Sequence, residues 1–320
     1  MAIEKLLKNK GINGQVPTFE DVTHISGIDR DEARTFPGWF WDYDNDGWLD
    51  IFACDYSFDE SLAADVAAEK LGIDNPEKNK MLLYHNNGDG TFKNVARKAG
   101  LNTFAFAMGS NFGDINNDGF LDIYLGTGNP LYESLIPNRM FLNIKGKSFA
   151  DVTSSARVGH LQKGHGVSFA DMDNDGDQDI YTDMGGAYPG DAYQNSFFLN
   201  PGQGNNHWIV LTLEGTEANR AAIGTRVKLT FRENGSQRSV YRDVNSGGSF
   251  GSSPHRREIG VGKATVVDEI EIKWHGSGHT QVLKNVRTNQ FLRLVEGNTD
   301  AETLTPKRIQ WTLPNRLCIE

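Results

Sequence analysis

The stretch DYDNDGWLD, residues 42–50, occurs twice more in the chain with small changes, as DINNDGFLD at 114–122 and DMDNDGDQD at 171–179. In all three copies, side chains that carry oxygen stand at positions 1, 3, 5 and 9, and glycine stands at position 6. A phenylalanine precedes each copy by two positions, and an isoleucine followed by an aromatic residue comes directly after it. Because this spacing is kept three times, we interpret it as one repeated structural unit.

The sequence around each loop is repeated as well. A phrase of the form Phe-x-Asp-Val-Thr opens each unit, in a weaker form (FKNVA) in the second, and an apolar run ending in asparagine closes it. The opening phrases are residues 19–23, 92–96 and 149–153, and the closing runs are 82–86, 140–143 and 197–200. Short apolar runs bounded by Gly, Asn and Asp are typical of strands, so we expect β-type units over residues 19–204. Residues 59–72 (DESLAADVAAEKLG) interrupt the first unit and predict a short helix.

The acidic loops predict metal sites. Four like charges in nine residues repel one another unless a cation neutralises them, and hard oxygen ligands in a flexible loop suit Ca²⁺. Side chains at positions 1, 3, 5 and 9 and the backbone carbonyl at position 7 are the expected ligands. We therefore predict about three Ca²⁺ sites, formed by Asp42, Asp44, Asp46, Trp48, Asp50, Asp114, Asn116, Asp118, Phe120, Asp122, Asp171, Asp173, Asp175, Asp177 and Asp179. The second loop has Asn116 where the others have Asp, so we expect it to bind more weakly.

Two other interpretations of these loops are disfavoured. An EF-hand needs a bidentate Glu at position 12 between two helices, but position 12 here is Ala53, Leu125 or Thr182. A general acid needs a carboxyl group kept neutral by apolar surroundings, whereas carboxylates crowded on a metal are held in the charged form. We therefore expect the loops to have a structural role and identify no catalytic residues.

The remainder of the chain has a different pattern. Residues 205–297 contain alternating, β-branched runs separated by Gly or Asn, which predict an antiparallel sandwich or small barrel. Residues 1–18 are expected to form an N-terminal extension and 298–320 a polar C-terminal tail, in which 309–313 could add a last strand. Residues 246–253 (SGGSFGSS) lack the lysine and helix of a phosphate-binding loop, so we expect a connection between strands.

Composition limits the class of protein. Hydrophobic residues are 38% and charged residues 23% of the chain, as in ordinary soluble domains. The formal charge of −10 argues against nucleic acid as a partner, because phosphate binding needs a basic surface. No apolar run is long enough to span a bilayer, and residues 1–14 lack the apolar core of a signal peptide. The two cysteines, Cys54 and Cys318, show no disulfide framework.

The loop pattern Phe-x-Asp-x-Asp-x-Asp-Gly-x-x-Asp-Ile resembles the FG-GAP/VCBS repeat, the calcium-loop unit of integrin-α-type β-propellers. The C-terminal part resembles the ASPIC/UnbV domain of proteins like cartilage acidic protein. The residues that carry this second resemblance are 219–227, 246–253, 259–264, 267–274 and 290–296. The resemblance implies an all-β fold, Ca²⁺ ligands at the loop positions, and a secreted, periplasmic or cell-surface setting. It also implies binding or adhesion rather than catalysis, with a protein or carbohydrate ligand.

Three functions follow as alternatives. The first is a calcium-stabilised adhesion or binding module that is not an enzyme. The second is a calcium-dependent enzyme acting on an extracellular polymer such as a polysaccharide. The third is an assembly subunit, because propellers of this kind close with about four to eight blades and only three are visible here. Another chain, or self-association through an open sheet edge, would then complete the propeller, unless the C-terminal domain covers that edge.

Overall fold

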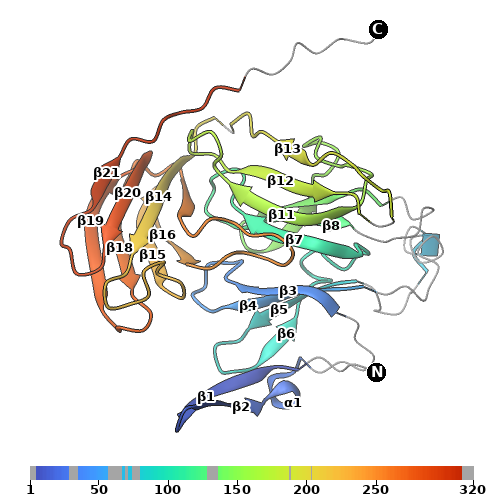
Figure 1. Ribbon diagram of the computed structural model, residues 1–320, viewed down its shortest axis with the longest axis horizontal. Helices are drawn as coiled ribbons and strands as arrows, with labels where there is room; N and C mark the ends of the chain where they lie inside the picture. The colour runs from blue at the N-terminus through green and yellow to red at the C-terminus, as the bar shows by residue number, and fades with distance from the viewer. Residues whose placement is uncertain are drawn as a thin grey trace.

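A computed structural model describes residues 5–28, 35–56, 67–68, 71–73, 80–127, 136–186, 189–202 and 204–311. The described chain is almost entirely β-structure, with one short helix, α1 (Thr23–Ser26) (Figure 1). The all-β class expected from the sequence is therefore confirmed. Most of the helix expected at residues 59–72 lies outside the described residues, although the amide of Leu71 donates to Ala67 over one helical turn. A helix long and apolar enough to cross a membrane is absent from the part described.

Three small antiparallel sheets form the blades of a propeller-like arrangement. Their inner strands β3, β7 and β11 lie side by side, and the later strands of each blade extend outward (Figure 1). The first blade is β3 (Thr35–Trp41), β4 (Asp50–Asp55), β5 (Met81–Asn86) and β6 (Phe92–Asn94). The second is β7 (Ala107–Gly113), β8 (Asp122–Thr127), β9 (Arg139–Ile144) and β10 (Ser148–Asp151). The third is β11 (Gly164–Ala170), β12 (Asp179–Met184) and β13 (Ser196–Phe198).

The repeated sequence phrases correspond to fixed places in a blade. Each acidic loop joins the inner strand to the second strand, and each closing asparagine lies at or just after the end of the third strand. The opening phrase forms the outer strand of the blade before it. In the third phrase Asp151 accepts hydrogen bonds from Thr153, and in the second Asn94 accepts the amide of Ala96. The second strands of the first two blades are buried on both faces, so they appear in the sequence as continuous apolar runs, whereas β12 in the third blade is exposed at Tyr181 and Asp183.

The C-terminal domain consists of two four-stranded sheets that share one apolar core. One sheet is β17 (Arg257–Gly262), β14 (His207–Glu214), β20 (Gln290–Val295) and β21 (Glu302–Leu304). The other is β16 (Ser236–Asp243), β15 (Arg226–Glu233), β18 (Val266–Lys273) and β19 (Thr280–Arg287). Alternate residues such as Leu229, Ile270 and Leu292 meet between them, and Trp274 is 2% exposed.

Three details differ from the sequence prediction. The sequence indicated three blade-like sheets, whereas the described residues form five sheets of three or four strands. The two additional sheets belong to the C-terminal domain. The expected antiparallel order is wrong for one pair, since β20 crosses from the other sheet and pairs in parallel with β14. The tail contains a strand, β21, at residues 302–304, whereas 309–311 pair with no strand.

Residues 245–253 connect β16 to β17, as expected, and this segment lies across the inner strands of the blades. Ser249 forms a β-bridge with Ser110 of β7, and the amide of Val167 in β11 donates to the carbonyl of Phe250. The Phe250 ring also contacts Phe36 of β3, at 5.2 Å between centroids. Gly248 is required here, because a Cβ atom would fall on the carbonyl oxygen of Ser110. The C-terminal domain therefore contacts all three blades.

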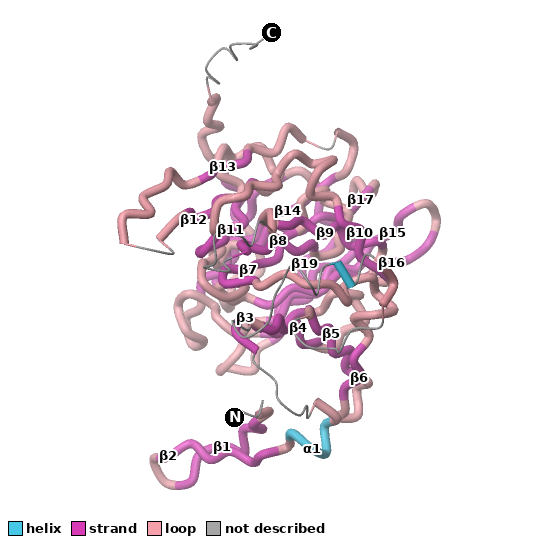
Figure 2. The backbone as a smooth tube through the Cα atoms, turned by 90° about the vertical axis from the view of Figure 1, so that its right-hand side faces the viewer, coloured by secondary structure: helices cyan, strands magenta, loops and turns pink. Residues whose placement is uncertain are grey.

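The N-terminal segment forms a hairpin of β1 (Leu7–Asn13) and β2 (Val16–Asp21). Figure 2 shows this hairpin at one end of the molecule, well away from the C-terminus. Phe19, which opens the first repeat, lies in β2 and is exposed. The hairpin therefore corresponds to the outer strand and its partner in the first two blades.

Candidate metal centre

The three acidic loops have the same backbone path. Asn at position 4 has a left-handed φ of 58°, 55° and 60° in the first, second and third loops, and the glycine at position 6 has a φ between 90° and 99°. The amide of that glycine donates to the position 1 carboxylate in each loop, at 3.0, 2.9 and 3.0 Å. Asparagine and glycine tolerate this geometry better than other residues do, which explains why they recur at these positions.

The curl of the chain brings most of the predicted ligands together. Carboxylate oxygens of positions 1, 3 and 5 lie within 4.8 Å of one another in the first loop (Asp42, Asp44, Asp46) and in the third (Asp171, Asp173, Asp175). In the second loop, the amide of Asp118 donates both to Asp114 and to Asn116, so the same curl is present with one charge fewer. At position 7, the amides of Trp48, Phe120 and Asp177 donate to the position 5 carboxylates.

Position 9 has a second role that the sequence did not indicate. One oxygen of Asp122 accepts the amide of Ile115 at the start of the loop, and the other accepts the amide of Asn143 in β9. Asp50 and Asp179 make the equivalent pairs of hydrogen bonds. All three carboxylates are at most 2% exposed. Each therefore fastens the loop to the third strand of its blade, whether or not it also binds a metal.

The electrostatics of the loops favour a bound cation. Burial raises the pKa of Asp42 to about 7, and the nearby charges of Asp44 and Asp46 add to the shift although Arg226 opposes it. Burial likewise raises the pKa of Asp50 to about 8 and that of Asp171 to about 6. In addition, Oδ1 atoms of Asp42 and Asp173 are buried without a hydrogen-bond partner. Buried carboxylates that repel one another and lack partners fit a divalent ion in these loops.

The C-terminal domain places one arginine beside the position 1 aspartate of each loop, and Arg238 also donates to the carbonyl of Asp118 in the second loop. Arg226 lies 3.2 Å from Asp42, and Arg242 lies 3.2 Å from Asp114. The third pair is wider, with Arg256 at 3.9 Å from the Asp171 carboxylate and hydrogen-bonded to its carbonyl. These three arginines are 85 to 184 positions from the aspartates that they contact, so the sequence alone did not place them at the loops. The loops therefore lie at the interface between propeller and C-terminal domain.

The C-terminal tail covers part of the third loop. Arg308 lies 3.0 Å from the Asp175 carboxylate, and the amide of Ile309 donates to the carbonyl of Asp173. Trp311 contacts the ring of Phe197 in β13, at 5.5 Å between centroids.

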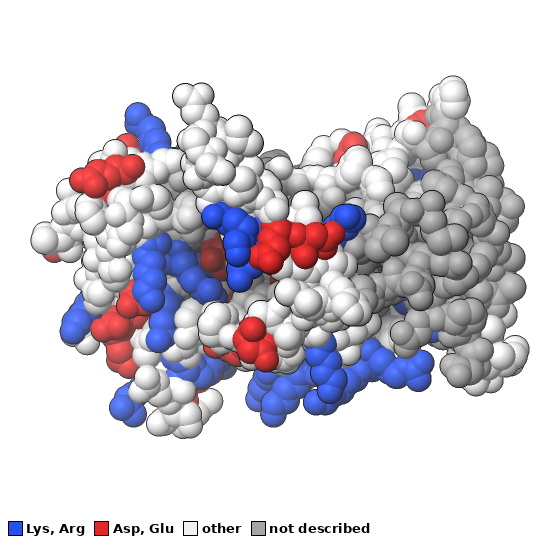
Figure 3. All heavy atoms as spheres, turned by 90° about the horizontal axis from the view of Figure 1, so that it is seen from below, with Lys and Arg blue, Asp and Glu red and all other residues white. Residues whose placement is uncertain are grey.

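The face of the molecule drawn in Figure 3 has only small, separate groups of acidic side chains, and lysines and arginines gather along one edge of it.

Asparagine at position 4 links each loop to the next segment. Nδ2 of Asn45 donates to the carbonyl of Gly119, and Nδ2 of Asn117 donates to the carbonyl of Gly176. Asn174 donates to Lys307 in the tail. Sequence analysis missed this role, although an asparagine at the same place in three loops was a visible signal. The three loops thus form one continuous hydrogen-bonded row.

Asn117→Gly is expected to lower the free energy of unfolding by about 1 kcal/mol, because it removes the link to the third loop and keeps the left-handed backbone. Asn117→Ala is expected to lose about 1 kcal/mol more, since alanine is strained at this φ. Urea unfolding measures both. Asn234, which has a φ of 50° in the β15–β16 turn, provides the control Asn234→Gly. Equal stabilities of Asn117→Gly and Asn234→Gly would show that the link contributes nothing.

The tryptophans near the first loop divide into two kinds. Trp39 and Trp41 are buried between blades, where they pack against Phe112 as part of the core. Trp48 is 52% exposed. Its ring therefore does not belong to the core, while its amide helps to shape the loop.

Comparison with known families agrees with this architecture. The family model for the FG-GAP-like repeat matches residues 42–125, which include the first two acidic loops. The family model named ASPIC and UnbV matches residues 215–301 in the C-terminal domain. The third loop lies beyond the first match but has the same geometry. No curated protein matches the chain. FG-GAP repeats suggest an extracellular or surface β-propeller module, and the chain contains an FG-GAP-like repeat followed by an ASPIC/UnbV domain.

Proposed function

We propose that this protein is a calcium-dependent binding or adhesion module of the cell exterior, and that it is not an enzyme. In this proposal, Ca²⁺ in three loops fixes the propeller blades against the C-terminal domain. The observation that carries the proposal is the set of buried, mutually repelling carboxylates at that interface, each loop with one arginine from the other domain. One arginine neutralises only part of the charge of loops that contain three to five aspartates.

The three loops are expected to differ in affinity. The second loop has Asn116 in place of Asp, and its Asp114 pairs with Arg242, which is only 5% exposed. Fewer negative charges and a buried arginine both reduce the attraction for a divalent ion. The third loop has five aspartates, so we expect it to bind Ca²⁺ most tightly. The proposed ligand of such a module is a protein or carbohydrate at the cell surface. The propeller and the C-terminal domain together would form the rigid surface that binds it.

Adding Ca²⁺ to the metal-free protein is expected to raise its melting temperature. An ion that binds only the folded state adds about 2.7 kcal/mol of stability at a concentration one hundred times its dissociation constant. Differential scanning calorimetry with Ca²⁺, Mg²⁺ and a chelator measures the effect, which should be smaller with Mg²⁺. Asp173→Asn should reduce the shift, whereas Asp183→Asn, an exposed aspartate outside the loops, should not. An unchanged melting temperature on chelation would refute the proposal.

A further inference from the structure

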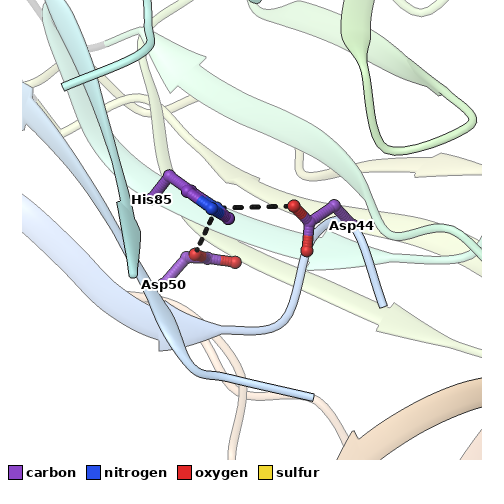
Figure 4. A group of neighbouring side chains, drawn as sticks. All are labelled: Asp44, Asp50 and His85. Carbon is purple, nitrogen blue, oxygen red and sulfur yellow. Dashed lines mark ion pairs between the residues drawn. The ribbon is translucent and has the colours of Figure 1, made fainter. Parts of the chain in front are cut away.

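His85 lies beside the first acidic loop, and its imidazole ring faces two of the loop carboxylates (Figure 4). Its Nδ1 atom lies 3.4 Å from Oδ2 of Asp44 and 3.3 Å from Oδ1 of Asp50. Neither contact has the geometry of a hydrogen bond, and Nδ1 is a buried atom without a hydrogen-bond partner in the described part of the chain. Donor atoms of the three side chains all lie within 4.8 Å of one another. They are therefore close enough to bind one ion.

The histidine is specific to the first blade. Strand registers place His85 at the position held by Leu142 in the second blade and by Leu199 in the third. Leucine offers no ligand atom, whereas the carboxylate beside it is kept, as Asp122 and Asp179. The first loop thus has a nitrogen donor that its two counterparts lack.

A second observation in the same loop also indicates a cation. Asp42 is 3% exposed, and its Oδ1 atom has no hydrogen-bond partner among the described residues. Its carboxylate lies within 4.8 Å of those of Asp44 and Asp46. Asp44 therefore belongs to two donor sets, one made of oxygen alone and one that includes the imidazole. A single ion in this loop can use either set.

The chemistry of the second set differs from that of a calcium site. Ca²⁺ is a hard ion bound by oxygen, while imidazole nitrogen with carboxylate oxygen suits Zn²⁺ and other transition metals. Four ligands at about 2.1 Å around Zn²⁺ lie about 3.4 Å from one another. The distances from Nδ1 of His85 to the two carboxylates, 3.4 and 3.3 Å, match that spacing. Three protein ligands leave a fourth position for water or for a group from a partner.

We propose that the first loop is a transition-metal site, in which His85, Asp44 and Asp50 bind an ion such as Zn²⁺ in competition with Ca²⁺. The inference rests on the proposed function to the extent that the loops bind cations at all. It adds that the first loop responds to a different metal from the other two. Because Asp44 is shared, occupancy by Zn²⁺ excludes Ca²⁺ from this loop and leaves the second and third loops unaffected.

Isothermal titration of the full chain with Zn²⁺, in buffer that contains Ca²⁺, tests the proposal. The variant His85→Leu installs the residue used by the other two blades, and His207→Gln removes a histidine outside the first loop as a control. Wild type and His207→Gln should bind one Zn²⁺ at least about tenfold more tightly than His85→Leu, since loss of even an outer-shell partner costs 10–100-fold. All three proteins should keep the rise in melting temperature that Ca²⁺ gives.

The outcomes separate the two proposals. Equal Zn²⁺ affinity in wild type and His85→Leu would overturn the zinc site, even where the effect of Ca²⁺ persists. A missing effect of Ca²⁺ in every protein would overturn the calcium proposal, and Zn²⁺ binding that depends on His85 would then still stand. If His85→Leu fails to fold, His85→Gln replaces it. The visible absorption of Co²⁺ bound to wild type gives an independent measurement, and a six-coordinate aqueous-type spectrum would contradict the site.

Discussion

Arg242→Met is expected to lower the free energy of unfolding of the metal-free protein by about 3–5 kcal/mol. Arg242 is 5% exposed and lies 3.2 Å from the Asp114 carboxylate, which is also buried. It further donates to the carbonyls of Gly119 and Tyr241. Methionine fills most of the volume, but it leaves Asp114 as a buried charge without its neutralising partner. Removing one member of a buried pair costs far more than the pair itself contributes.

Electrostatic shifts within this pair explain why the loss is large. Burial lowers the pKa of Arg242 and raises that of Asp114 to about 7, although the two groups attract each other. Desolvation therefore outweighs attraction for both partners, and each is tolerated only in the presence of the other. A bound cation in the second loop would take over part of the role of Arg242. The loss in Ca²⁺ should accordingly be smaller than the loss with chelator.

Chemical denaturation with and without Ca²⁺ measures both losses. Arg220→Met is the matched control, because Arg220 is in the same domain and pairs with Glu214 but its side chain is 87% exposed. Exposed pairs contribute about 0–1 kcal/mol. A loss for Arg242→Met no larger than that for Arg220→Met would show that the domain interface does not depend on the buried pair.

The sequence predicted the loops and the strands on either side of them because these depend on local chemistry. Three copies of one spacing identify the ligands, and Gly and Asn at fixed places identify the turn. The apolar run after each loop, such as residues 123–125, indicates the buried second strand. Such features need only neighbours within a few positions, so one sequence is enough to find them.

The interface between domains could not be predicted in this way. Arg242 is 128 positions from Asp114, and nothing in its own surroundings distinguishes it from the exposed arginines of the same strands. His85 ends an apolar run, and the other two repeats have leucine at the same position. In the sequence alone it therefore looks like an ordinary substitution between repeats. The position of residues 245–253 across the blades depends on both domains being folded. Contacts of this kind become visible only in three dimensions.

The contacts at the interface also connect metal binding to domain docking. Each position 1 aspartate faces a loop on one side and an arginine of the C-terminal domain on the other. An ion that binds the loop makes the net charge beside that arginine less negative. By linkage, anything that separates the domains should therefore change metal affinity, and the reverse. The other two arginines, Arg226 and Arg256, are more exposed than Arg242, so the second loop should dominate docking when metal is absent.

Glu296→Gln is expected to lower the free energy of unfolding at neutral pH by about 3 kcal/mol, through the C-terminal domain alone. One oxygen of Glu296 accepts the amides of Thr216, Glu217 and Ala218, at 2.8, 2.9 and 2.8 Å. The other oxygen accepts the hydroxyl of Ser277. The residue is 3% exposed, and it fixes the loop after β14 beside the end of β20. A neutral amide keeps the shape but weakens each of these charge-assisted bonds.

The same carboxylate predicts a dependence on pH. Burial alone would raise the pKa of Glu296, but the bonds from Ser277 and the three amides outweigh it and lower the pKa from 4.5 to about 2. A group with a lowered folded-state pKa stabilises the protein above its unfolded pKa. The stabilising contribution of Glu296 should therefore be complete above pH 5 and disappear between about pH 4.5 and 2.

The difference in the free energy of unfolding between wild type and Glu296→Gln should shrink over that range. Glu302→Gln, which removes an exposed partner of Arg293 in β21, should show almost no difference at any pH. A gap between wild type and Glu296→Gln that stayed constant down to pH 2 would mean that its charge does not hold the loop, because a protonated Glu296 resembles glutamine.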